Sequence, residues 1–118
     1  MISKTSDQIK EKIKRLEELE AEYPAAIKAK TQTQAAYDLE MAKTILRLKN
    51  GDINEFEGQA CGVTPISIIE KIAKGICWEG GLACSASDMQ LKALESKIKI
   101  AQAQLNGYQS IFRHLAEN

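Results

Sequence analysis

Aromatic side chains are scarce in this sequence of 118 residues, which contains one Trp, three Tyr and two Phe. A core with so few aromatic rings must draw most of its apolar area from Ile, Leu and Met. These aliphatic side chains suit the seams between helices better than the two-sheet core of a β-sandwich. The chain length also fits one domain with a thin core. We therefore expect a single, mostly α-helical domain.

A net charge and a long apolar run are both absent from the sequence. Lys and Arg together number 16, as do Asp and Glu, and no segment has the large basic excess of a strong nucleic-acid binder. No apolar stretch reaches the roughly 18 residues of a membrane span, and the first residues are too polar for a secretory signal. The odd number of cysteines, three, fits a reducing compartment. We expect a cytoplasmic protein with no membrane partner.

Patterns for catalysis and metal binding are also missing. The one histidine, His114, lies on the last predicted helix near its polar C-terminus, where it has no evident nucleophile to activate. The cysteines at positions 61, 77 and 84 lack the C-x2-C spacing of structural zinc sites. There is neither a P-loop nor a G-x-G-x-x-G motif. We expect no enzymatic activity, no cofactor, no bound metal and no intramolecular disulfide.

The strongest positive signal is a helix over residues 87–116. Ser87 and Gln90 fit a capping box at its start, as Thr5 and Gln8 do near the start of the chain. Apolar side chains then alternate spacings of three and four at Leu91, Leu94, Ile98, Ala101, Leu105, Tyr108, Phe112 and Leu115. This heptad seam predicts that the helix packs along another helix.

A second apolar stripe runs through residues 6–49, with Pro24 inside it. Proline lacks a backbone donor and disfavours helical geometry at the residue before it. The pattern therefore predicts a helix that is kinked or restarts at Pro24, so that 6–22 could form a third helix. Asn50 and Gly51 predict its C-terminal cap.

Residues 50–86 form an insert between the two long helical patterns. Thr64 as N-cap, Pro65 in the first turn and Gly75 as C-cap predict one short helix. Residues 75–86 resemble a loop or a short hairpin around two consecutive glycines. The predicted fold class is thus all-α: a long antiparallel, coiled-coil-like helical hairpin with a short helix and a loop between its arms.

The matched lengths of 25–49 and 88–116 predict antiparallel pairing. The apolar pattern also allows a shift by one heptad, with Met41 beside Leu91 or Leu105, but we take the register that sets Leu48 beside Leu91, in which partner residue numbers add to about 139. Met41 then lies beside Ile98. This register leaves the stripe on 6–22 without a partner on the hairpin, so a second copy of the chain is the nearest source of apolar surface. The register therefore predicts self-association.

The same N-terminal segment supplies a candidate partner-binding surface. It combines two apolar side chains with an acidic cluster: Ile9, Ile13, Glu17, Glu18, Glu20 and Glu22. The simpler interpretations are that the stripe packs on its own hairpin and that the carboxylates form a solvated helix face.

A nucleic-acid reader is a weaker hypothesis. The segment from Ala60 to Gly75 resembles a helix-turn-helix, with Gly62 in the turn and Thr64 starting the recognition helix. Glu57 falls where the preceding helix usually buries an apolar residue, and the acidic residues nearby would face phosphates unfavourably. A short structural helix that closes the hairpin is the simpler interpretation.

Two stretches, AAYDLEMAKTILRLKNG (35–51) and QLNGYQSIFRHLAEN (104–118), are similar in style to small helical accessory proteins of phages and prophages. The resemblance implies an origin in a mobile element and transfers no site residue. Such proteins inhibit host defences, including CRISPR effectors, or assist phage recombination. We therefore expect a non-enzymatic binding protein, phage-encoded and directed at a host defence protein. The alternative is a nucleic-acid-binding recombination accessory or regulator, and a structural assembly component comes third.

Overall fold

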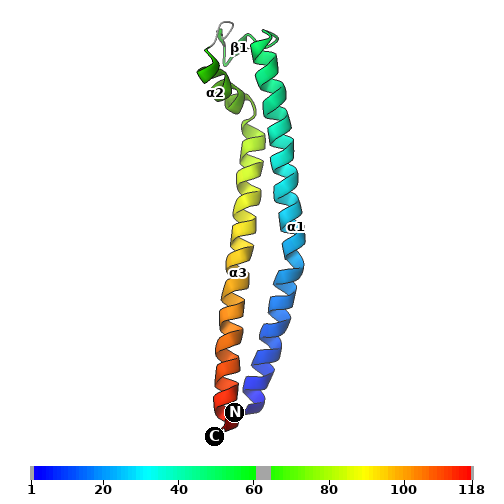
Figure 1. Cartoon of the computed structure of the whole chain (residues 1–118), viewed down its shortest axis with the longest axis vertical. Coiled ribbons are helices and arrows are strands. Elements are labelled where there is room, and N and C mark those ends of the chain that lie inside the picture. Colours follow the sequence, from blue (N-terminus) through cyan, green and yellow to red (C-terminus); the bar gives the residue numbers. More distant parts are fainter. Residues whose placement is uncertain (1, 61–64, 118) are drawn as a thin grey trace. The chain divides into compact units, whose positions relative to one another are not determined.

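The computed structural model describes residues 2–60 and 65–117 of the chain. In chain order these residues form α1 (Ile2–Lys49), β1 (Glu55–Phe56), β2 (Gln59–Ala60), α2 (Ile66–Ile76) and α3 (Trp78–Glu117) (Figure 1). The predicted fold class, a helical hairpin with a short helix and loop as its insert, is confirmed. Contacts divide the chain into two compact units, one of Met1–Lys28 with Met89–Asn118 and one of Ala29–Asp88, and each is described by itself.

The first unit is an antiparallel pair made by α1 and α3. Its buried cluster consists of Leu19, Leu94 and Ala101, and the half-buried side chains packed against it are Leu16, Tyr23, Ala26 and Ile98. All eight residues of the predicted seam, from Leu91 to Leu115, are buried or half-buried. The heptad pattern therefore identified the contact face of α3 correctly.

Within this unit α1 continues through Pro24 without a break, so the predicted restart and the third helix are wrong. A proline in a helix interior removes one backbone donor and its ring crowds the carbonyl four residues earlier, at a cost of about 3 kcal/mol. Tyr23 and Ala26, on either side of Pro24, pack against the same apolar cluster, and this burial offsets the local cost. The capping box at Thr5 is also wrong, because α1 begins at Ile2 and Thr5 is a buried residue within it.

The predicted register is wrong as well. Ile98 packs against the cluster of Leu19, whereas Met41 packs in the second unit. The Lys12 ammonium donates to Gln104 Oε1 at 3.3 Å, and these residue numbers add to 116 instead of about 139. The N-terminal stripe therefore has its partner on α3 of the same chain, which removes the argument that a second copy must cover it.

In the second unit, α1 ends where the sequence predicts. Gly51 has a φ of 78°, the left-handed conformation that glycine adopts at low cost. The Asp52 N–H donates to the Arg47 carbonyl at 2.9 Å, and the Gly51 N–H donates to the Leu48 carbonyl at 3.3 Å. This pair of bonds is the Schellman motif, which satisfies carbonyls that the helix end leaves open. The predicted cap at Asn50-Gly51 is confirmed.

The insert contains a two-strand hairpin that the sequence pattern did not predict. Glu55 pairs with Ala60, and Phe56 pairs with Gln59. The two loop residues, Glu57 and Gly58, have positive φ values of 53° and 75°, as a tight hairpin turn requires. The Phe56 ring lies directly on Gly75 of α2, so the hairpin packs against the short helix.

The short helix α2 is confirmed, with different ends. Its N-cap is Pro65 and its C-cap is Cys77, while the predicted N-cap Thr64 lies outside the described residues. Ile69 and Ala73 bury one face of α2 in a cluster with Leu48 of α1. The insert is thereby held to the end of α1 by apolar packing.

The predicted loop over 75–86 is wrong, because α3 begins at Trp78. The small residues there form a helix face that a second helix approaches closely. Gly80 lies against the Tyr37 ring, and the Cys84 thiol donates to the Thr33 carbonyl at 3.2 Å. Ser87, predicted to cap the helix, is instead buried within it.

The contact with Tyr37 predicts that alanine substitutions at two adjacent glycines change the free energy of unfolding differently. A Cβ at Gly80 would lie 3.1 Å from both Tyr37 Cδ1 and Glu40 Oε2, whereas the nearest atom to a Cβ at Gly81 is Tyr37 Cε1 at 3.7 Å. Gly81→Ala should therefore raise the free energy of unfolding by about 0.5–1 kcal/mol, because alanine favours the helix. Gly80→Ala should gain nothing or lose stability, because its methyl group crowds Tyr37.

Urea denaturation of the two variants beside the wild-type chain measures this difference. Gly107→Ala is the control, since nothing lies within 4 Å of its added Cβ. Equal stabilisation at Gly80 and Gly81 would contradict the close approach of Tyr37.

Candidate protein-binding surfaces

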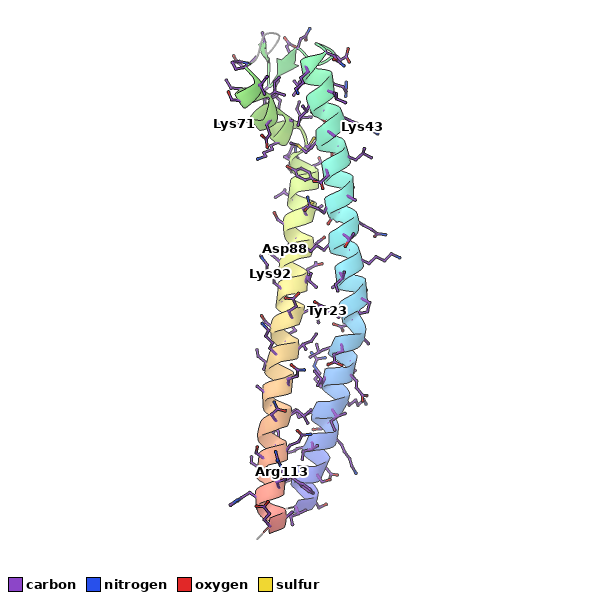
Figure 2. The ribbon with its side chains drawn as sticks, viewed as in Figure 1. Tyr23, Lys43, Lys71, Asp88, Lys92 and Arg113 are labelled. Carbon is purple, nitrogen blue, oxygen red and sulfur yellow. The ribbon has the colours of Figure 1, made fainter. Side chains whose placement is uncertain are left out.

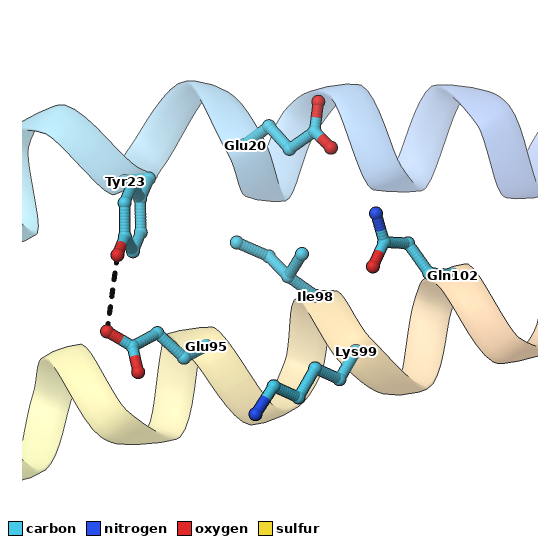
Figure 3. A pocket seen from close by; sticks show the side chains of 6 residues that line it. All are labelled: Glu20, Tyr23, Glu95, Ile98, Lys99 and Gln102. Carbon is cyan, nitrogen blue, oxygen red and sulfur yellow. Dashed lines mark hydrogen bonds between the residues drawn. The ribbon is translucent and has the colours of Figure 1, made fainter.

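A hollow of the first unit lies between its two helices and is shown in Figure 3. Glu20 and Tyr23 of α1 and Glu95, Ile98, Lys99 and Gln102 of α3 line a volume of about 470 Å³. The Tyr23 hydroxyl donates to Glu95 Oε1 at 3.2 Å, and Gln102 points toward α1. These groups can hold a polar side chain over the apolar floor of Ile98.

The six predicted partner-binding residues all lie on the first unit, but they do not form one patch. The four carboxylates are exposed: Glu17, Glu18, Glu20 and Glu22. At about 100° of rotation per residue they point in widely different directions around α1. Glu20 lines the hollow described above, and Glu18 lies 3.9 Å from the Arg15 guanidinium.

The two predicted isoleucines differ in burial. Ile9 is half-buried and lines a second hollow of about 380 Å³, together with Ser6 of α1 and with Phe112 and Arg113 of α3. Ile13 is 38% exposed. The stripe to which they belong is thus largely an intrachain contact face, and only its edge is accessible to a partner.

The helix-turn-helix interpretation is wrong in its first helix. The residues before α2 that the structure describes form the hairpin of β1 and β2, and Gly62 and Thr64 lie outside the described residues. A helix-turn-helix needs a helix in that place to cross the DNA backbone. α2 is better interpreted as a structural helix that packs against the end of α1 in the second unit.

No arrangement for a metal ion is present in the described part of the chain, which holds no group of three or more His, Cys, Asp or Glu side chains in suitable positions. His114 is exposed on α3. Within residues 2–60 and 65–117, no helix combines the length and apolar character needed to cross a bilayer.

A surface that the sequence interpretation missed lies on α3 of the first unit. Met89, Ile100 and Ile111 are 70%, 58% and 50% exposed, and small exposed side chains occupy the positions between them. At about 100° per residue these positions share one face, roughly 130° around the helix from the seam, and Ile100 also borders a hollow with Arg15 and Leu19 of α1. We call this face the outer stripe, and its members are Met89, Ala93, Ser96, Ile100, Ala103, Gly107 and Ile111.

The outer stripe contains no charged residue, which separates it from the solvated face of α1 in the same unit. There the exposed positions alternate in charge through Asp7, Lys10, Glu11, Lys14 and Glu18. The signal was present in the sequence as spacings of three and four, but Ala, Ser and Gly fill most of the positions. α3 therefore carries two uncharged faces, and its partner on α1 covers only one of them.

Comparison of the chain with protein-family models, with curated proteins and with solved structures gives no match. The surface itself therefore carries the functional argument.

The contacts around the hollow predict that removing the Tyr23 hydroxyl lowers the free energy of unfolding slightly, whereas truncating the buried core beside it lowers this free energy strongly. Tyr23→Phe removes the hydrogen bond to Glu95 and should cost about 0.5–1.5 kcal/mol. Leu19→Ala removes a side chain that is 3% exposed and should cost about 2–5 kcal/mol. Thermal and urea unfolding measure both values, and a Tyr23→Phe cost as large as that of Leu19→Ala would show that the hydroxyl is more than a local contact.

A chemical prediction concerns Cys77, in the second unit. Its thiol is 1% exposed, and its Sγ lies 3.4 Å from Thr44 Oγ1. Burial raises the pKa of Cys77 above its ordinary value; the Thr44 hydrogen bond lowers this pKa and Glu40 raises it. The unfolded thiol therefore ionises at lower pH than the folded one, so the free energy of unfolding should fall as pH rises above about 9.

Iodoacetamide labelling followed by mass spectrometry at pH 8 provides the readout. Cys77 should react much more slowly than the half-buried Cys84 until the chain is unfolded in urea, because the thiolate is the nucleophile. Equal labelling of the two in the folded chain would contradict the burial of Cys77.

Proposed function

We propose that the chain is a non-enzymatic protein-binding module whose contact surface is the outer stripe of α3. The observation that carries the proposal is the run of exposed, uncharged positions from Met89 to Ile111, about 33 Å along the helix axis. Single exposed apolar side chains are ordinary on protein surfaces. An aligned stripe at helical spacing is the pattern through which helices dock on one another.

The sharper form of the proposal is an inhibitor of a host defence protein, encoded by a phage. Its support is the similarity of residues 35–51 and 104–118 to phage accessory proteins. An inhibitor of this kind acts by occupying a surface of its target, which requires an accessible contact face and no catalytic group. Nucleic acid is a less suitable partner for the outer stripe, because the large side chains along its centre are apolar and make no contact that phosphates favour.

A photo-crosslinker incorporated on the outer stripe tests the proposal in the cells that express the chain. With benzoylphenylalanine at Ala103 or at Ser96, ultraviolet light should yield an adduct with one protein. The same group at Lys14, which is exposed on α1, should not, because that helix face is charged and solvated. Mass spectrometry of the adduct identifies the partner.

A variant of the stripe separates specific docking from random collision. Ile100→Asn should reduce the adduct at Ala103 by about tenfold or more, because the stripe loses its central apolar side chain. Equal adducts from the stripe and from Lys14, or an adduct that Ile100→Asn leaves unchanged, would refute the outer stripe as the contact surface.

A further inference from the structure

The charges beside the outer stripe have one sign. Lys97 and Lys99 are both exposed and lie on opposite sides of the stripe, about 60° and about 100° from Ile100 at 100° per residue. Lys99 also lines the hollow of the first unit, and its ammonium points away from α1 (Figure 3). The centre of the stripe at Ile100 thus has a cation on each side.

The carboxylates nearest to these lysines line the hollow between the helices: Glu95 of α3, four residues before Lys99, and Glu20 of α1. Between Met89 and Phe112 the helix has one acidic residue, Glu95. It is half-buried and accepts the Tyr23 hydroxyl at 3.2 Å on the side facing α1. The outer face of α3 in this range is therefore apolar at its centre and basic along both edges.

We propose that the outer stripe binds an amphipathic helix of a partner protein whose apolar face is edged by Asp and Glu. This inference rests on the proposed function and adds the chemistry of the partner. The large side chains at Met89, Ile100 and Ile111 alternate with small ones, so a facing helix can insert its own side chains between them. Nothing lies within 4 Å of a Cβ at Gly107, so an incoming backbone can approach there.

A second copy of the chain fits this surface less well. Two copies of α3 paired antiparallel about Ile100 would set Lys97 near the other Lys97 and Lys99 near the other Lys99. Like charges across a contact oppose association, whereas carboxylates on the partner would neutralise both edges. The charge pattern therefore selects an acidic partner over self-association through this face.

Two synthetic peptides provide the test with the full chain. Both are helices of about three heptads with Leu and Ala on one face; one has Glu at every flanking position, and its twin has Lys there. The fluorescein-labelled acidic peptide should bind with at least about tenfold higher affinity by fluorescence anisotropy at about 20 mM NaCl, and raising the salt to about 500 mM should reduce this preference.

Substitutions identify the site and the source of the preference. Ile100→Asn should abolish binding of the acidic peptide, whereas Leu46→Asn should not, although Leu46 of α1 has the same exposed fraction, 58%. The double variant Lys97→Glu, Lys99→Glu should prefer the basic twin. The control double variant Lys10→Glu, Lys14→Glu, on the exposed face of α1, should keep the preference of the wild-type chain. Circular dichroism checks that each variant is folded.

The remaining outcomes overturn the inference in distinguishable ways. If both peptides bind equally and Ile100→Asn abolishes both, the stripe docks helices without charge selection, so the proposed function stands and the acidic partner fails. If neither peptide binds, the acidic helix is likewise rejected, and the crosslinking result decides the proposed function separately. If sedimentation shows a dimer that Ile100→Asn dissociates, the occupant is a second copy.

Discussion

The apolar contact between α1 and α3 around Leu19 determines what the first unit can present to a partner. Leu19, Leu94 and Ala101 are at most 7% exposed, and a fully buried leucine contributes about 1.5–3 kcal/mol. This contact fixes the rotation of α3 about its axis. Because side chains repeat every 3.6 residues, a fixed seam also fixes which residues face away from it. The outer stripe is therefore positioned by the burial of the seam.

The same contact limits how much apolar surface the unit can cover. A helix in a two-helix pair has one neighbour, so a second stripe on that helix must remain in water. In the second unit a further helix, α2, covers additional apolar surface. Its Ile69 and Ala73 pack against Leu48 at the end of α1. The side chains of the chain are drawn in Figure 2. No comparable element packs within the described part of the first unit. A neighbour for the outer stripe of the first unit would therefore have to come from another protein.

The sequence pattern predicted the parts of the fold that depend on strong apolar periodicity or on one special backbone position. The seam of α3 and the cap at Gly51 belong to this group. The start of α3 could not be predicted in the same way, because Gly80 and Cys84 carry no large apolar side chain and consecutive glycines are common in loops. Their role is visible only when Tyr37 and Thr33 lie against them. The sequence pattern predicted a last helix that begins at residue 87 and a first helix that is kinked or restarts at Pro24. The register between the two helices, which was aligned on these lengths, was wrong as a result.

The candidate surface, like the fold, could be predicted only in part from the sequence. The stripe positions could be counted in the sequence, but only the burial of the seam shows that they face outward. Their residue types then argue against a purely solvated role. Ser96 and Gly107 are weaker helix formers than Lys or Glu, glycine by about 1 kcal/mol relative to alanine, and neither adds a charge to the face. A helix face that only contacts water gains nothing from such residues, whereas a face approached by another helix gains both space and an uncharged surface.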